Sequence, residues 1–153
     1  MLALSGYPQW FWLMLQTWPN RKDVENRRWV VPAPIRELLP LRIYLHGSQH
    51  MEPISNMGMA RQLLTQPQWT EFYTTDFQKY RGAIMGELTI VSYKYRFGDE
   101  NANLYSKWHF PGQYGFYTVD PLLYDKPIPC KGRPFFFNIE LPANQSKEVQ
   151  KST

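Results

Sequence analysis

The sequence predicts a small α+β domain, mainly β, in which a barrel of short strands is flanked by two or three helices. Short apolar or alternating segments recur along the chain, and turn-forming residues such as glycine, proline and asparagine separate them. A few further stretches carry apolar residues at helical spacing. The length of 153 residues is that of one domain with a core of its own, and no internal repeat divides the chain.

The first third of the chain is expected to contain three strands and a helix. Residues 2–5 are a short apolar run that ends at a glycine, which predicts a strand and a turn. Pro8 suits the first turn of a helix, because no backbone N–H is needed there, and Pro19 is expected to end that helix. Residues 23–31 and 41–46 alternate along the chain and predict two further strands.

The middle of the chain is expected to hold one or two helices, over residues 56–66 and 69–80. Residues 82–93 give the longest strand signal, and the glycines at 82 and 86 predict the bends or bulge that barrel strands need. After a polar loop, the last strands are expected over residues 114–120 and 134–141. We therefore expect one domain over residues 1–142 and, because the remaining sequence is polar and lacks periodicity, a flexible tail over residues 143–153.

Charge and aromatic content favour a phosphate-bearing or planar partner, although only weakly. The net charge is +4 with a pI near 9.2, and residues 20–29 hold four of the cations. Six Trp, ten Tyr and nine Phe are many for this length. Most of these rings are expected in the core, and a few are expected to line a cleft in which a planar ligand stacks.

Several classes of protein do not fit the composition. Cys130 is the only cysteine, so no intramolecular disulfide forms, and the three histidines lack zinc-site spacing. We therefore expect no metal and no cofactor. No stretch approaches about 20 uninterrupted apolar residues, and the first 19 residues lack a charged leader and a cleavage site. A cytoplasmic protein without a membrane span is expected.

Three charged residues form the sharpest candidate site. Glu25 and Arg27 share one face of the expected strand by its period of two, and Lys22 lies on the turn before it. The two cations have the chemistry of a phosphate clamp. The carboxylate can accept from a base amino group or act as a general base. The alternative reading is a surface ion-pair network, which typically contributes about 0–1 kcal/mol per pair.

Aromatic rings supply the candidates for stacking against a base. These are Trp10 and Trp29, with Tyr114 and Phe116 behind them. Trp29 is favoured because it follows the cationic strand on the same face as Arg27. Any one such ring, taken alone, is more often part of a core.

Polar residues at strand ends complete the set. His46 and Ser48 end a strand, where side chains can reach a cleft, although a histidine there is more often a hydrogen-bonded structural residue. Neither Ser5 nor Ser48 lies in a G-x-S-x-G elbow, so neither is expected to be a nucleophile. If the protein is a hydrolase, activation of a water by Lys22 and Glu25 is the simpler mechanism.

Several short motifs follow one another in a recognisable order. They are Leu4-Ser5, Gln9-Trp10, Lys22-x-x-Glu25-x-Arg27-x-Trp29, IYLHGS at 43–48, GAIMGELTIV at 82–91, PGQYGFYTVDP at 111–121 and PIPCKG at 127–132. Together they resemble the ASCH domain, a branch of the PUA-like superfamily, from residue 2 to about residue 141. The resemblance implies a PUA-like β-barrel with a cleft between the barrel and the first helix.

The resemblance also implies a function, since the superfamily includes readers of RNA and of modified bases. The leading hypothesis is binding of single-stranded RNA or a modified nucleotide in a basic, aromatic-lined cleft. The alternative is a small hydrolase, either an amidase on acylated nucleosides or a single-strand ribonuclease, with Lys22 and Glu25 as the catalytic residues. A third hypothesis is a protein-interaction module. The nucleotide-binding residues expected are Ser5, Gln9, Trp10, Lys22, Glu25, Arg27, Trp29, His46, Ser48 and Tyr114.

Overall fold

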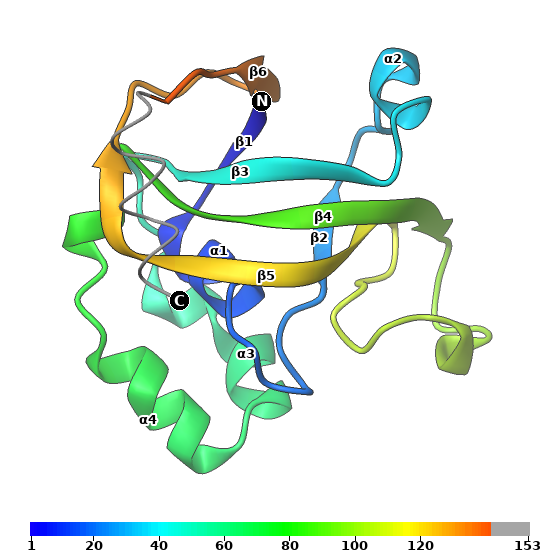
Figure 1. Cartoon of the computed structure of the whole chain (residues 1–153). Helices are drawn as coiled ribbons and strands as arrows, with labels where there is room; N and C mark the ends of the chain where they lie inside the picture. The colour runs from blue at the N-terminus through cyan, green and yellow to red at the C-terminus, as the bar shows by residue number, and fades with distance from the viewer. Residues whose placement is uncertain (142–153) are drawn as a thin grey trace.

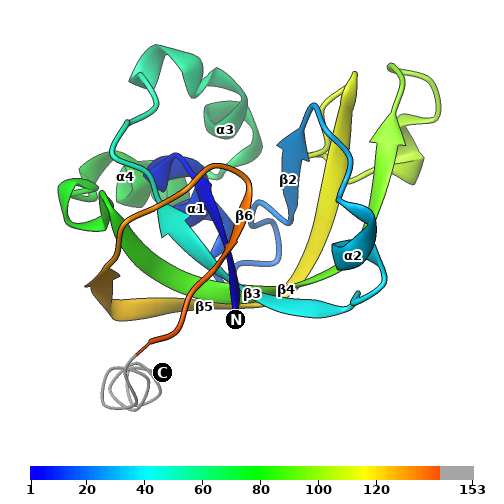
Figure 2. The same ribbon diagram turned by 90° about the horizontal axis from the view of Figure 1, so that it is seen from above.

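A curved, mixed sheet of six strands organises the computed structural model, which describes residues 1–141 (Figures 1 and 2). The strand order is β2-β5-β4-β3-β1-β6; β1 runs parallel to β3 and every other neighbouring pair is antiparallel. The strands are β1 (Leu2–Gly6), β2 (Val24–Arg27), β3 (Leu41–Gly47), β4 (Ala83–Arg96), β5 (Gln113–Pro129) and β6 (Phe136–Asn138).

Four α-helices accompany the sheet, which curves into a half-barrel. They are α1 (Pro8–Met14), α2 (Ala33–Arg36), α3 (Gly58–Leu63) and α4 (Gln66–Thr74). Helices α1, α3 and α4 lie together on the concave side of the sheet (Figure 2). The predicted class, an α+β fold that is mainly β and barrel-like, is confirmed, with four α-helices among the described residues where two or three were expected.

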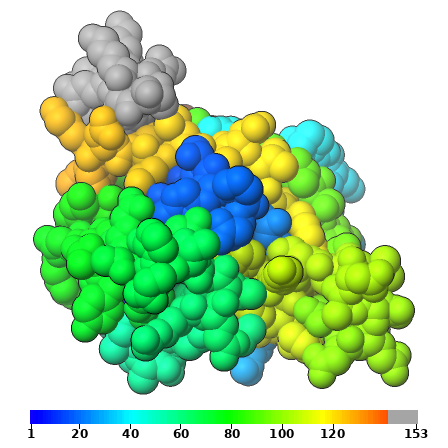
Figure 3. All heavy atoms as spheres, turned by 90° about the horizontal axis from the view of Figure 1, so that it is seen from below, coloured from blue at the N-terminus to red at the C-terminus, as the bar shows by residue number. Residues whose placement is uncertain are grey.

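The main core lies between α1 and the sheet. Six of the seven residues of α1 are buried, and Trp10 is the one that is not. Trp12 packs against Phe72 of α4, with 6.1 Å between the ring centroids, so α4 covers α1 from outside. In the space-filling view, the blue N-terminal residues are bordered by the green residues around 60–80 and by the yellow-green residues around 100 (Figure 3).

The two predicted glycine positions do bend the longest hairpin. Gly82 has a φ of +62°, a left-handed conformation that favours glycine, and the β4–β5 register shifts between Ile84 and Gly86. A Cβ atom on Gly86 would lie 2.2 Å from the carbonyl oxygen of Leu122, so only glycine allows β5 to approach this closely.

Most element predictions agree with the structure, and the differences have local causes. Strand β2 ends at Arg27 rather than at residue 31, before the proline-rich stretch in which the one-turn helix α2 forms. Strand β5 continues through residues 121–129, where three prolines obscure the strand pattern. The predicted tail over residues 143–153 lies outside the described residues. Within residues 1–141 no helix is both long and apolar enough to span a membrane.

Candidate functional site

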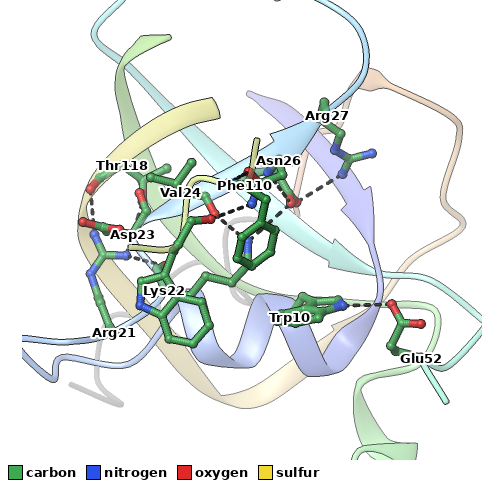
Figure 4. Close-up of polar contacts among 12 residues, drawn as sticks. Trp10, Arg21, Lys22, Asp23, Val24, Asn26, Arg27, Glu52, Phe110 and Thr118 are labelled. Atoms are coloured by element: carbon green, nitrogen blue, oxygen red, sulfur yellow. Dashed lines mark hydrogen bonds and ion pairs between the residues drawn. The ribbon is translucent and has the colours of Figure 1, made fainter. Parts of the chain in front are cut away.

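An open cavity of about 520 Å³ lies where the end of β1, the start of α1 and strand β2 meet (Figure 4). Six of the ten sequence-predicted residues line it, although they come from four separate parts of the chain. They are Ser5, Trp10, Lys22, Glu25, Arg27 and Ser48.

Lys22 is the most unusual residue of this cavity, because its side chain is charged and only 2% of the residue is exposed. The turn that carries it is fastened to α1, since the backbone N–H of Lys22 donates to the carbonyl of Leu13. The guanidinium of Arg21 donates to the carbonyls of Met14 and Thr118 and closes the same turn against β5 (Figure 4). The ammonium of Lys22 is therefore held in place by backbone contacts on both sides.

The Lys22 ammonium has three neighbours that suit a cation. It donates a 2.5 Å hydrogen bond to the carbonyl of Val24, lies 3.6 Å from Oε1 of Glu25, and stands 5.6 Å from the centre of the Trp10 ring. Burial nevertheless lowers the pKa of Lys22, Glu25 opposes that change, and the charge on Arg27 adds to it. The surroundings of the ammonium therefore disfavour its charged form relative to water.

Glu25 joins the two cations. Its Oε2 lies 3.3 Å from Nη2 of Arg27, and its Oε1 accepts from the backbone N–H of Asn26. The same Nη2 of Arg27 donates to the carbonyl of Ser5 at 2.7 Å, which ties β2 to the end of β1 across the cavity. The carboxylate is therefore fixed in orientation, with one oxygen toward each cation.

Trp10 is oriented by a residue that the sequence did not indicate. Its Nε1 donates to Oε2 of Glu52 at 2.9 Å, and Glu52 also lines the cavity. Gln9, which is buried and outside the lining, positions the same segment, since its amide exchanges two hydrogen bonds with the backbone of Glu52. Gln9 therefore supports the site from behind rather than facing a ligand.

The charges of the lining balance one another. Lys22 and Arg27 contribute two positive charges, and Glu25 and Glu52 contribute two negative ones. The sequence suggested a basic cleft, but its two cations are already compensated by carboxylates. This balance favours a ligand that is polar and neutral within the cavity over a bare phosphate.

The remaining wall comes from the segment before β5. Both polar atoms of the Asn26 side chain bond to this segment. Nδ2 donates to the carbonyl of Trp108, and Oδ1 accepts from the backbone N–H of Phe110. These bonds place Phe110 and Gln113 at the cavity. Among the described residues, no group of three His, Cys, Asp or Glu side chains is arranged to hold a metal ion.

Three predicted residues besides Gln9 lie outside the cavity lining. Trp29 lies beyond the end of β2, with the Arg27 guanidinium 5.7 Å from its ring centre. It packs edge-on against Phe116, Phe135 and Phe136, so it belongs to an aromatic cluster that adjoins the cavity at Arg27. Tyr114 packs against Tyr95, with 5.0 Å between the ring centroids. The period of two indicated which face of a strand a ring takes, but not which neighbours would cover that face.

His46 is a buried structural residue with a fixed tautomer. Its Nε2 lies 2.6 Å from the carbonyl of Cys130, which can only accept, so Nε2 carries the proton and Nδ1 accepts from the hydroxyl of Ser5. Gly132 packs over this pair, because a Cβ there would lie 2.3 Å from Cε1 of His46. The structure thus agrees with the commoner reading of a strand-end histidine.

This burial predicts a loss of stability in mild acid. Burial lowers the pKa of His46, despite its bond to Cys130, and likewise lowers that of His109. The unfolded chain therefore takes up protons first as the pH falls below about 6.5. We expect the free energy of unfolding to decrease there by at most about 1.4 kcal/mol per pH unit for each histidine. Urea unfolding at pH 7.5 and 5.5 measures this, and His46→Gln should reduce the difference; an unchanged difference would contradict the assignment.

Two of the lining residues that the sequence did not single out lie in segments without periodicity. Glu52 lies between Met51 and Pro53, and Phe110 precedes a turn, so each reaches the cavity only through tertiary contacts. Two others had a signal: Gln113 lies within the motif at 111–121, and Asn26 stands within the cationic motif, on the opposite face from Glu25 and Arg27.

The comparisons with known proteins support the fold. No protein-family model matches the chain, and no curated protein matches it either. Among solved structures, the crystal structure of ASCH from Zymomonas mobilis is similar, with a TM-score of 0.51 and 13% sequence identity over 98% of this chain and 93% of that chain. At this identity the similarity concerns the architecture, and the chain has a fold like that of this ASCH structure.

Proposed function

We propose that the cavity binds one nucleoside unit, either as part of single-stranded RNA or as a modified nucleoside. The observation that carries the proposal is the buried ammonium of Lys22, held beside the Glu25 carboxylate in a cavity that stays open. A buried charge that costs stability is typical of a functional site, since a structural role does not require it. The volume of about 520 Å³ falls in the range of small-ligand sites.

The arrangement of donors and acceptors suits the edge of a base. Lys22 offers a donor 3.6 Å from an acceptor oxygen of Glu25. Nucleobases present the complementary pair, an acceptor beside an N–H donor, on their hydrogen-bonding edges. Trp10, half-buried and fixed through its Nε1, supplies a flat ring beside them. Stacking on such a ring contributes roughly 1–3 kcal/mol per base.

The balanced charge of the lining favours a position of the phosphates outside the cavity. A phosphate within the cavity would meet the two carboxylates as well as the two cations. We therefore expect the base and sugar to enter, while the phosphates of an RNA strand remain at the rim. The resemblance of the motifs to ASCH domains, and a fold like that of the Zymomonas mobilis structure, are consistent with this assignment.

One observation favours a second candidate function, hydrolysis of an amide on an acylated nucleoside. The lowered pKa of Lys22 makes a neutral amine more accessible, and a neutral amine next to a carboxylate can take a proton from water. The water oxygen would add to the acyl carbon, the C–N bond would break, and the proton would pass to the departing amine. Cleavage of single-stranded RNA at the same two residues is the other form of this candidate.

Calorimetric titration with product analysis separates the two functions. Nucleosides, N-acetylated cytidine and short single-stranded RNAs are added to wild type, to Lys22→Met and to Lys126→Met, whose lysine is exposed on β5. We expect saturable binding by wild type and by Lys126→Met, and a loss of at least tenfold in Lys22→Met. Product that appears only with an intact Lys22 would favour the hydrolase. If no ligand of the panel binds or reacts, the proposed function is wrong for these ligand classes.

A further inference from the structure

A second hollow, of about 550 Å³, lies on the helical side of the molecule. It is formed by the stretch 54–58, which precedes and begins α3, together with α4. Tyr73 of α4 is 67% exposed at its edge, Trp69 is half-buried beside it, and Met57 is fully buried among the lining residues. One exposed and one half-buried ring beside a hollow offer apolar surface on which a planar ligand can stack.

The charge of this hollow differs from that of the first cavity. Among the described residues that line it, Arg61 alone is charged, and no carboxylate within residues 1–141 pairs with it. The guanidinium of Arg61 lies over Trp69, 5.6 Å from the ring centre. Because Arg61 is exposed, it can leave this ring for an anion at little cost. The hollow therefore combines aromatic rings with one uncompensated positive charge.

Two contacts connect this hollow with the first cavity. Glu52 accepts from Trp10 through one carboxylate oxygen and from Asn56 through the other, so the stretch 52–56 separates the two spaces. Because consecutive Cα atoms are 3.8 Å apart, Glu52 in the cavity and Ile54 in the hollow lie within about 8 Å of each other.

The second contact ties α4 to the turn of Lys22. The amides of Asn20 and Gln68 exchange two hydrogen bonds of 2.8 Å each. Gln68 also forms the capping box of α4 with Thr65, so the position of the helix is fixed relative to Lys22. Because Trp69 follows Gln68 in α4, the position of its ring relative to the first cavity is fixed as well.

We propose that the hollow on α3 and α4 binds the neighbouring nucleotide of a single RNA strand, with its base against Tyr73 and Trp69 and its phosphate on Arg61. The inference rests on the proposed function, since the first cavity holds the adjacent nucleoside. Together the two sites divide the ligand by chemistry: the balanced cavity takes a neutral base, and the positively charged hollow takes a base with its phosphate.

An RNA strand fits the hollow better than a protein partner does. A stable protein interface uses roughly 20–30 residues on each side, whereas nine residues line this hollow. A base with its phosphate needs a ring and a cation side by side, which Trp69, Tyr73 and Arg61 provide.

Length dependence of binding tests the inference. The probes are adenosine, cytidine and uridine and the matching homopolymeric tetraribonucleotides, titrated into wild type, Trp69→Leu, Arg61→Gln and Lys22→Met. Phe97→Leu is the control, because Phe97 is 87% exposed beyond the end of β4, across the molecule from α4 (Figures 1 and 2). Trp69 packs on Phe72, whereas Arg61 is exposed, so Arg61→Gln keeps the test valid if Trp69→Leu unfolds the protein.

We expect Trp69→Leu and Arg61→Gln to weaken tetranucleotide binding at least fivefold and to leave nucleoside binding unchanged. In Arg61→Gln the dependence of log K on log salt should also fall by about 0.7, as for one lost phosphate contact. Unchanged tetranucleotide affinity in both variants would overturn the inference. Tetranucleotide binding that depends on Arg61 but not on Lys22 would support the hollow and reject the proposed function, and an absence of all binding would reject both.

Discussion

Replacement of Lys22 by methionine is expected to raise the free energy of unfolding at pH 7 by about 1–2 kcal/mol while abolishing ligand binding. The two side chains have similar volumes, so the packing against Trp10 and α1 is retained. What disappears is an ammonium that burial destabilises, together with its contacts to the Glu25 carboxylate, the Val24 carbonyl and the Trp10 ring. Glu25 keeps its contacts with Arg27 and with the backbone N–H of Asn26, so no carboxylate is left alone.

The pH dependence of the free energy of unfolding tests whether the buried ammonium is the cause. Because the folded protein holds the pKa of Lys22 below that of the unfolded chain, unfolding takes up a proton between the two values. The stability of wild type should therefore rise as the pH increases toward about 10.4, which is the pKa of an unperturbed lysine. Lys22→Met lacks this contribution, so its advantage should shrink with rising pH.

Thermal and urea unfolding at pH 7 and 9.5 measure both effects. Lys126→Met, at an exposed position, is the control and should change stability by less than about 0.5 kcal/mol. A Lys22→Met protein that is less stable than wild type at pH 7 would show that the ammonium is a net stabilising element. The burial of the ammonium would then be explained by stability alone and would not indicate a functional site.

Replacement of Glu25 by glutamine should have the opposite effect on stability, with a loss of about 3 kcal/mol at pH 7. Glutamine retains the shape of the side chain but removes the charge that both cations face. Lys22 would then be buried next to Arg27 without compensation, which is more costly than removing the pair altogether. Ligand binding should be lost as well, because the acceptor beside the ammonium has become an amide.

A double-variant comparison measures the interaction between Lys22 and Glu25. If the loss in Glu25→Gln comes from the uncompensated ammonium, Lys22→Met combined with Glu25→Gln should recover most of it. Glu37→Gln, at an exposed position, is the matched control. Urea unfolding of the four proteins gives the interaction free energy. Equal losses in Glu25→Gln and in the double variant would mean that Glu25 stabilises the fold by some route other than Lys22.

The two substitutions are expected to change the free energy of unfolding in opposite directions, because the site contains a buried charge that burial disfavours. An ion pair kept for stability alone gains little from such burial, since the free energy of desolvation offsets the attraction. A ligand that accepts a hydrogen bond from Lys22 supplies part of the missing solvation. The cost in stability and the capacity to bind therefore have the same physical origin.

The sequence by itself determined those parts of the protein that depend on local pattern. Strands β1, β3 and β4 appear where the sequence predicts them, from the apolar run at 2–5, the alternation at 41–46 and the strand signal at 82–93, which are properties of each segment alone. The glycines at 82 and 86 indicated the turn before β4 and the register shift within it, because glycine is itself a local signal. Glu25 and Arg27 share a face and contact each other because they lie two residues apart in one strand.

Only the tertiary structure decided which residues meet across the cavity and which charges are compensated. Trp29 follows the end of β2 and His46 lies near the end of β3, and they contact Phe135 and Cys130, both of which come from more than 80 residues away. Glu52 reaches Trp10 across 42 residues and turns a predicted basic cleft into a balanced one. Burial and electrostatic compensation depend on contacts between distant segments, and no local pattern in the chain records those contacts.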